Sequence, residues 1–225
     1  MRRTSIALVL ATCVAAVVAL SAAQMPASPL RDQFLVPVSG TWRAEIEDGL
    51  RVLTIDGEAA RTAPDAAAVQ GLFGAAAPGV VAALAAPGAF PLAVARDVTN
   101  FPGGRLQVQF KLVAGATDQT AGIVFNLKPD GSYTYARYNT KDGNVAIWKF
   151  EHGARTVLQH GELHEQLAKN EWHTLDVRVA GAVVTATANG KLTVSHTLPG
   201  PVSGRVGLWT KTDSVTAFRR FTASH

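Results

Sequence analysis

Two neighbouring stretches of the sequence carry aromatic, guanidinium and amide side chains at alternate positions. Aromatic rings pack on the C–H faces of sugars, while guanidinium and amide groups hydrogen-bond to hydroxyls. Together these side chains are suited to bind a carbohydrate. The alternative is that the rings belong to the core and that the arginine pairs with a neighbouring acid. The alternate positions are Tyr133, Tyr135, Arg137 and Asn139 in the first stretch and Asn144, Ala146, Trp148 and Phe150 in the second.

The end of the sequence adds three candidates to this face. Trp209 and Lys211 fall on one side of a predicted strand, and Asp213 follows in a turn. A place in the core is the alternative for Trp209. The full set of candidate ligand-binding residues is Tyr135, Arg137, Asn139, Asn144, Trp148, Trp209, Lys211 and Asp213.

Other kinds of chemistry find little support in the sequence. His160 and His164 are four residues apart, as zinc ligands on one helix face would be, but Gly161 disfavours a helix and no third ligand has a suitable spacing. No phosphate-binding loop or dinucleotide fingerprint is present, so we predict no nucleotide cofactor. The net charge is +4 without a long run of lysine or arginine, which argues against a nucleic-acid partner.

Strands must position these side chains. Residues 106–113 alternate apolar with polar side chains, as a strand with one buried face does. Similar short stretches recur along the chain, separated by turn residues such as Asn189 and Gly190. At least ten such strands with few helices predict an all-β fold, an antiparallel two-sheet jelly-roll sandwich.

An insertion rich in Ala, Gly and Pro interrupts the strands over residues 59–95. Asp65 suits the start of a helix and Gly74 its end, so we predict a short helix through Phe73 and further turns over 80–86. Large apolar residues are too frequent here for a flexible linker. We therefore predict a packed helical insertion. A second short helical crossing is predicted over residues 163–167.

The first residues are typical of a secretory signal peptide. Arg2 and Arg3 precede an apolar run over 6–20 and small residues up to Ala23, after which we expect cleavage. Removing these two arginines and no acids from the net charge of +4 leaves +2. The run is shorter than the roughly 20 residues that span a bilayer, which favours a cleaved signal peptide. An uncleaved anchor is the alternative. The only cysteine, Cys13, lies inside this segment, so we predict no disulfide in the mature chain.

We accordingly expect an exported protein, periplasmic or extracellular, without stable membrane insertion after cleavage. Its expected parts are the signal peptide (1–23), an N-terminal tail with the first strand (24–41) and one sandwich domain (42–225).

Several segments together resemble the concanavalin A-like lectin and glucanase superfamily. They are AGIVF at 121–125, YTYARYN at 133–139, NV at 144–145, EWHTL at 171–175 and GRVGLWTK at 204–211. The similarity covers residues 42–221, and its nearest branch is the laminin-G-like domains known as 3-keto-disaccharide hydrolases or family 16 glycoside-hydrolase-like domains. The resemblance implies two stacked, curved sheets whose concave face often receives sugars. It does not fix an activity, because the superfamily contains lectins, hydrolases and adhesion modules.

The resemblance also implies two sites that the sequence can be searched for. Family 16 glucanases carry a Glu-x-Asp-x-Glu or Glu-x-Asp-x-x-Glu strand with two catalytic carboxylates, and the nearest approach, residues 45–48, lacks that spacing. Related sandwiches often hold a calcium ion at the rim, where Asp118, Asp130 and Asp142 are candidates, although turn aspartates usually serve the backbone. We predict no cofactor and no catalytic metal, with a structural calcium as the alternative.

Three functions stay open at this point. The first is non-catalytic recognition of a carbohydrate or glycoconjugate. The second is cleavage of a glycosidic bond after oxidation of the sugar at C3, in which elimination needs a general base and an enolate stabiliser. The third is an adhesion or envelope-assembly module without a sugar site. A groove lined by Arg137, Asn139 and Lys211 with a carboxylate nearby would favour the enzyme.

Overall fold

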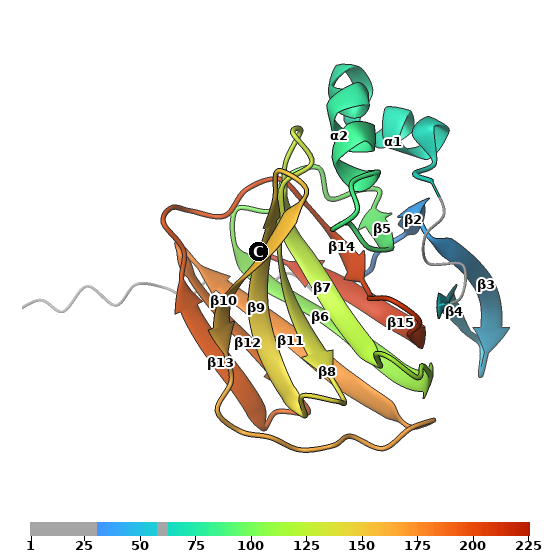
Figure 1. Cartoon of the computed structure of the whole chain (residues 1–225), viewed down its shortest axis with the longest axis vertical. Helices are drawn as coiled ribbons and strands as arrows, with labels where there is room; N and C mark the ends of the chain where they lie inside the picture. The colour runs from blue at the N-terminus through green and yellow to red at the C-terminus, as the bar shows by residue number, and fades with distance from the viewer. Residues whose placement is uncertain (1–30, 58–62) are drawn as a thin grey trace, which may run out of the picture.

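Two antiparallel sheets stacked as a sandwich make up most of the computed structural model, which describes residues 31–57 and 63–225 (Figure 1). The fold predicted from alternation and turns is confirmed. The eight-stranded sheet runs β13 (Leu192–Thr197), β12 (Val183–Ala188), β11 (Trp172–Ala180), β6 (Gly104–Ala114), β15 (Val215–Ser224), β4 (Leu50–Asp56) and β3 (Thr41–Glu47), with β1 (Arg31–Asp32) paired to β15. The seven-stranded sheet runs β10 (Ala154–His160), β9 (Asn144–Glu151), β8 (Tyr133–Asn139), β7 (Thr120–Leu127), β14 (Arg205–Trp209), β5 (Leu92–Ala95) and β2 (Leu35–Ser39).

The core lies between the two sheets and follows from the period of two. In β6, Val108 and Phe110 are fully buried, whereas the intervening Gln109 is partly exposed. Phe110 stacks on Tyr138 of the opposite sheet with ring centroids 6.0 Å apart. Because each strand sends alternate residues into this core, the other half of the seven-stranded sheet's side chains points to its outer face.

The alanine-rich insertion forms two helices, α1 (Ala66–Phe73) and α2 (Ala77–Leu84), joined by the 3-10 turn η2 (Gly74–Ala76). We call this unit the helical cap. The Asp65 side chain accepts a hydrogen bond from the backbone N–H of Ala68 at 3.0 Å, and Gly74 has a φ of 55°. The predicted start and end of the first helix are therefore confirmed.

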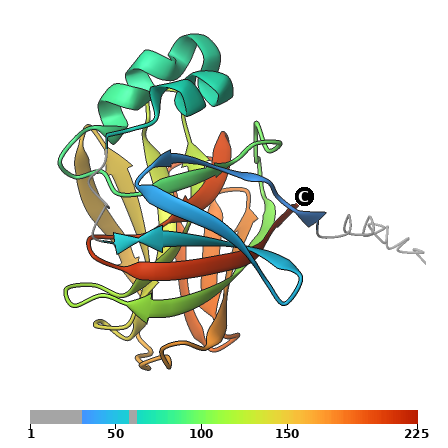
Figure 2. The same ribbon diagram turned by 90° about the vertical axis from the view of Figure 1, so that its right-hand side faces the viewer.

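The helical cap lies at one end of the sandwich, beside β2 and β5 (Figures 1 and 2). Taken together, Ala66–Leu84 has 19 residues and a mean hydropathy of 1.6, so by length and composition it could span a membrane. Its larger side chains are used differently in this fold. Val69, Val80 and Leu84 are buried in a cluster with Leu92 and other outer-face residues of the seven-stranded sheet, which makes the cap part of the domain.

The helical crossing predicted for residues 163–167 is wrong, since this segment has no regular secondary structure. The hydroxyl of Tyr138 donates a hydrogen bond to the carbonyl of Glu165 and accepts one from the N–H of Leu167, both at 2.8 Å. The N–H of Glu165 donates to the carbonyl of Gly143 at 2.7 Å. Because the sheet already satisfies these backbone groups, a helix would gain nothing here.

The predicted signal peptide, with its cleavage after Ala23, lies outside the described residues. The segment expected as a tail with the first strand contains β2, which pairs with β5 and so belongs to the seven-stranded sheet.

Candidate functional site

The helical cap divides the outer face of the seven-stranded sheet into a covered end and an open end. At the covered end, Val124, Tyr133 and Phe150 are buried in the cluster that includes the cap. Of the two positions left open for Tyr133, the binding face and the core, the core is confirmed, because the insertion covers this residue. Burial also raises the pKa of the Tyr133 hydroxyl above its usual range.

At the open end, one row of residues crosses the sheet with large side chains next to small ones. The strand register pairs Trp209 with Gly122, Gly122 with Arg137, Arg137 with Ala146 and Ala146 with His160. Glycine has no side chain and alanine only a methyl group. Gly122 makes room for the Trp209 ring, since a Cβ there would lie 3.0 Å from that ring, and Ala146 leaves a hollow beside Arg137.

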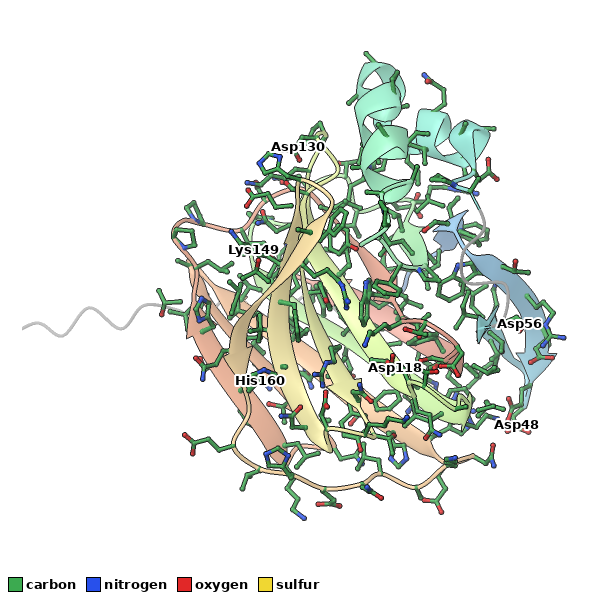
Figure 3. All side chains as sticks on the ribbon, in the orientation of Figure 1. Asp48, Asp56, Asp118, Asp130, Lys149 and His160 are labelled. Carbon is green, nitrogen blue, oxygen red and sulfur yellow. The ribbon has the colours of Figure 1, made fainter. Side chains whose placement is uncertain are left out.

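This hollow is a cavity of about 340 Å³, which we call the Arg137 pocket. Its volume lies within the range of about 300–1,000 Å³ that is usual for small-ligand sites. Figure 3 shows His160 near the end of β10 and Asp118 near the start of β7, on the two sides of this part of the sheet. The lining residues are Asp118, Tyr135, Arg137, Asn139, Lys141, Asp142, Trp148, Arg155, His160, Trp209 and Lys211.

The pocket brings together six of the eight residues predicted from the sequence, and two stay outside it. Asn144 and Asp213 do not line it. The six are Tyr135, Arg137, Asn139, Trp148, Trp209 and Lys211.

Aromatic rings form the floor and one wall of the pocket. Tyr135 and Trp209 stack with centroids 4.2 Å apart and are each 1% exposed, so they form the floor. Trp148 stacks at 6.4 Å from Tyr135 and is partly exposed, which makes it the ring that a ligand can reach. Burial raises the pKa of Tyr135 to about 12, against the opposing charge of Arg155. Its hydroxyl therefore stays protonated at neutral pH.

The guanidinium of Arg137 is held by groups of the protein itself. Its Nη2 donates to a carboxylate oxygen of Asp142 at 2.5 Å, and its Nη1 donates to the backbone and side-chain oxygens of Asn144 at 3.2 and 3.1 Å. Burial lowers the pKa of Arg137, and the charge of Asp142 opposes that effect. Asn144 thus positions Arg137, and the pair of Arg137 with Asp142 forms a rigid side of the pocket.

Asp118 connects the opposite side of the pocket. It forms an ion pair with Lys211 at 3.0 Å and accepts a hydrogen bond from the Asn139 amide at 3.1 Å. The amide oxygen of Asn139 accepts from the N–H of Lys141 at 3.0 Å. The amide that was predicted to bind a ligand is therefore already partnered, while Lys211 is 28% exposed on its side chain.

Asp213 fixes the turn that carries Asp118. Its carboxylate accepts hydrogen bonds from the backbone N–H groups of Ala116, Thr117 and Asp118 at 2.7, 2.7 and 2.8 Å. Burial acts to raise the pKa of Asp213, but these three N–H donors outweigh it and lower the pKa to about 2. The carboxylate is ionised at neutral pH and acts on the pocket through Asp118.

Five lining residues lie outside the predicted ligand-binding set: Asp118, Lys141, Asp142, Arg155 and His160. Two of them come from β10. Strict alternation would put Arg155 and His160 on opposite faces of β10, but a β-bulge shifts the register between Val157 and Gln159. Both residues therefore pair with outer-face residues of β9, and both line the pocket. No residue type marks this bulge in the sequence. His160 meets the Trp148 ring edge-on with centroids 6.0 Å apart.

The residues considered for metal binding are engaged elsewhere. His164 contacts the carbonyl of Asp142 through Nδ1 at 2.7 Å, and Asp130 accepts a hydrogen bond from the N–H of Ser132 at 2.9 Å. Asp118 and Asp142 form the ion pairs described above. Within residues 31–57 and 63–225, no three His, Cys, Asp or Glu side chains are placed to share a metal ion.

Comparison with known proteins places the chain in a family. The family model described as a 3-keto-alpha-glucoside-1,2-lyase-like domain matches residues 42–223. A comparison with curated protein sequences finds no match.

Similar solved structures share the sandwich fold at low identity. The carbohydrate-binding module CBM66 from Bacillus subtilis superposes with a TM-score of 0.60 at 15% identity, covering 84% of this chain and 94% of that one. A putative glycosyl hydrolase from Parabacteroides distasonis gives 0.48 at 13% identity, covering 84% and 86%. A β-glucanase from Bacillus licheniformis gives 0.46 at 13% identity, covering 89% and 92%. The first of these supports the fold alone, and the matched family model carries the assignment: this chain belongs to the family of 3-keto-alpha-glucoside-1,2-lyase-like domains, built on a concanavalin A-like sandwich.

Proposed function

We propose that this domain binds a carbohydrate in the Arg137 pocket. The observation that carries the proposal is the partly exposed Trp148 ring in a cavity whose walls also carry Lys211 and His160. A sugar ring can pack its C–H face on the indole while these side chains bond its hydroxyls. The buried Tyr135 ring stacks beside Trp148 and is itself stacked on Trp209.

A larger cavity beside the helical cap fits this role less well. It has a volume of about 500 Å³ and is lined mainly by alanine and proline, with Phe90 at its edge. Ser39 and Thr212 supply its only polar side chains among the lining residues, and none is charged. Sugar specificity needs several converging hydrogen-bonding groups, which the Arg137 pocket has and this cavity lacks.

A glycan-binding screen with two tryptophan variants tests the proposal. Trp148→Ala removes the exposed ring of the pocket, and we expect the affinity for any bound glycan to fall by at least about tenfold. Trp172→Ala is the matched control, because Trp172 is also partly exposed but lies on β11 of the other sheet, under Lys111 and Arg219. Equal binding by the wild type and Trp148→Ala would contradict the proposal.

A second candidate function is elimination from a 3-keto glycoside. Family membership favours it, and so does the combination of His160 with Asp118 and Asp142 beside the cations of the pocket. Both carboxylates are paired with cations, so His160 is the candidate general base. It would take the C2 proton, and the electron pair of that bond would form an enolate with the C3 ketone. Collapse of the enolate would then form the C1–C2 double bond and expel the glycosidic oxygen, which takes up a proton.

Incubation of the purified protein with a 3-keto glucoside in D₂O tests this second function. Cleavage, or deuterium at C2 without cleavage, is expected to depend on His160. The variant His160→Asn should lower either rate by about 100-fold or more, while His196→Asn on β13 is the control. If the wild type shows neither deuterium exchange nor cleavage, the elimination is excluded and the binding proposal stays intact.

We also propose that the protein is exported, on the basis of the arginine pair, the apolar run and the small residues before Gln24. Mass spectrometry of the protein from a secretion-competent host is expected to give a mature N-terminus at Gln24. A full-length chain retained inside the cell would contradict export.

A further inference from the structure

Arg155 and Lys141 are the two cations of the Arg137 pocket that have no acidic partner among residues 31–57 and 63–225. Arg137 pairs with Asp142 and Lys211 with Asp118, so the charges of both pairs are largely compensated. Arg155 forms no ion pair or side-chain hydrogen bond with an acid among the residues that the structure describes. Its charge is therefore available to a ligand.

Aromatic rings hold Arg155 in place. Its guanidinium carbon lies 4.4 Å from the ring centroid of Phe90 and 5.9 Å from that of Trp148. A guanidinium can pack its flat face on rings and use the N–H groups at its edge for other partners, and the neutral Tyr135 hydroxyl is the polar side-chain group of the protein that interacts with Arg155. Two parallel N–H donors match the two oxygens of a carboxylate. Arg155 is partly exposed, so a ligand that lies on Trp148 can reach it.

The charge of the whole pocket also favours an anionic ligand. Its lining includes four cations, Arg137, Lys141, Arg155 and Lys211, and two anions, Asp118 and Asp142, which leaves an excess of two positive charges with His160 counted as neutral. Of the unpaired cations, Lys141 is exposed to solvent, whereas Arg155 lies between rings. A neutral sugar carries no charge that could compensate this excess of positive charge.

We propose that the pocket selects an acidic sugar, with the carboxylate of a uronic acid bound by the guanidinium edge of Arg155 while the sugar ring packs on Trp148. This inference rests on the proposed carbohydrate binding and names its ligand class. The regular pairing of Arg155 with Phe150 puts Arg155 on this face, and the bulge beyond Val157 brings His160 to the same face.

Binding measurements with matched pairs of glycosides test the acidic ligand. Each pair shares one ring: methyl glucoside with methyl glucuronide, and methyl galactoside with methyl galacturonide, together with the 6-sulfated form of each neutral sugar. We expect the wild type to bind at least one uronide about tenfold more tightly than its neutral partner, with the difference shrinking as salt is added.

Three variants identify the group responsible. Arg155→Gln should abolish the preference for the acid and keep the affinity for the neutral sugar, and Arg155→Lys should keep part of the preference, since it retains the charge without the planar pair of donors. Arg51→Gln is the matched control, because Arg51 also lies 4.4 Å from a phenylalanine ring, that of Phe34, but on β4 of the other sheet. Melting curves of all variants verify that they are folded.

Each other outcome overturns a defined part of the inference. Equal binding of acid and neutral sugar would overturn the acidic ligand and leave carbohydrate binding in place. A preference for the 6-sulfated sugars alone would contradict the proposal that the bound acidic group is a carboxylate. If Arg155→Gln lowers the affinity for the acidic and the neutral sugar equally, Arg155 only supports the ring of Trp148. Binding of no sugar at all would overturn the proposed function as well.

Discussion

The covered and open ends of one sheet face are built by the same strands but have opposite properties. On β8, Tyr133 lies under the helical cap in an apolar cluster, and Arg137, four residues further along the same face, lies in a charged pocket. The neighbours explain the difference. Phe150 pairs with Tyr133 and stacks on its ring, whereas the small residues Gly122 and Ala146 pair with Arg137.

The comparison teaches that alternation decides which face a side chain joins, while small residues and distant segments decide whether that face is core or site. The cap comes from residues far from β8 in the sequence, and it converts one end of the face into a second core. At the open end the small residue Gly122 lets the Trp209 ring lie close to the sheet, where it forms the floor of the Arg137 pocket. Trp209 belongs to both ends, since it contacts Phe90 edge-on and stacks on Tyr135.

The largest expected effect comes from removing that shared residue. Trp209 is 1% exposed, and Trp209→Ala should lower the free energy of unfolding by about 3–5 kcal/mol because it opens a large cavity. It should also weaken glycan binding, because Tyr135 and Trp148 lose their support. Urea unfolding and glycan titration measure the two effects. A stability loss without a binding loss would show that the two ends do not share this residue functionally.

A smaller effect, confined to stability, is expected at the covered end. Leu84 is 5% exposed and packs in the cap cluster, so Leu84→Ala should lower the free energy of unfolding by about 2–3 kcal/mol. Affinity at the Arg137 pocket should stay unchanged, because Leu84 does not line it. The same urea and titration experiments apply. A clear loss of affinity would mean that the cap also shapes the open end.

Most of the fold was predictable from local patterns. The strand predicted at 133–139 coincides with β8, and the Asp65 and Gly74 signals place both ends of α1. Six pocket residues were predictable because a period of two brings alternate residues to one face. The coverage of Tyr133 was not, because it depends on packing between distant segments. The place of His160 was not either, because a bulge between Val157 and Gln159 reverses the alternation.

As the pH falls, the open end should lose stability before the covered end does. The pKa of Asp213 is lowered to about 2, below its unfolded value, so its stabilisation is complete above about pH 4 and is lost as the pH falls toward 2. The full shift corresponds to about 2 kcal/mol, and partial exposure reduces this to about 1–2 kcal/mol.

Hydrogen exchange between pH 4 and pH 2.5 checks this order. The N–H groups of Ala116, Thr117 and Asp118 should lose protection while those of the helical cap keep it. In Asp213→Asn, which has no carboxylate to protonate, the turn should be less protected at every pH and insensitive to acid in this range. Simultaneous loss at both ends would point to global unfolding instead.

The smallest effect on stability should come from adding a methyl group at Gly122, beneath the floor of the Arg137 pocket. A Cβ on Gly122 would lie 3.0 Å from the Trp209 ring and 3.2 Å from the carbonyl of Ala136. Gly122→Ala therefore requires a shift of a few tenths of an ångström, at a cost of about 1 kcal/mol. Because the ring that moves forms the floor of the Arg137 pocket, glycan affinity should fall by about fivefold, which corresponds to about 1 kcal/mol. Gly71→Ala in the exposed part of α1, where a Cβ meets nothing within 4 Å, is the control and should be neutral or slightly stabilising. If Gly122→Ala bound glycans as the wild type does, the low floor beside Arg137 would not be what separates the open end from the covered one.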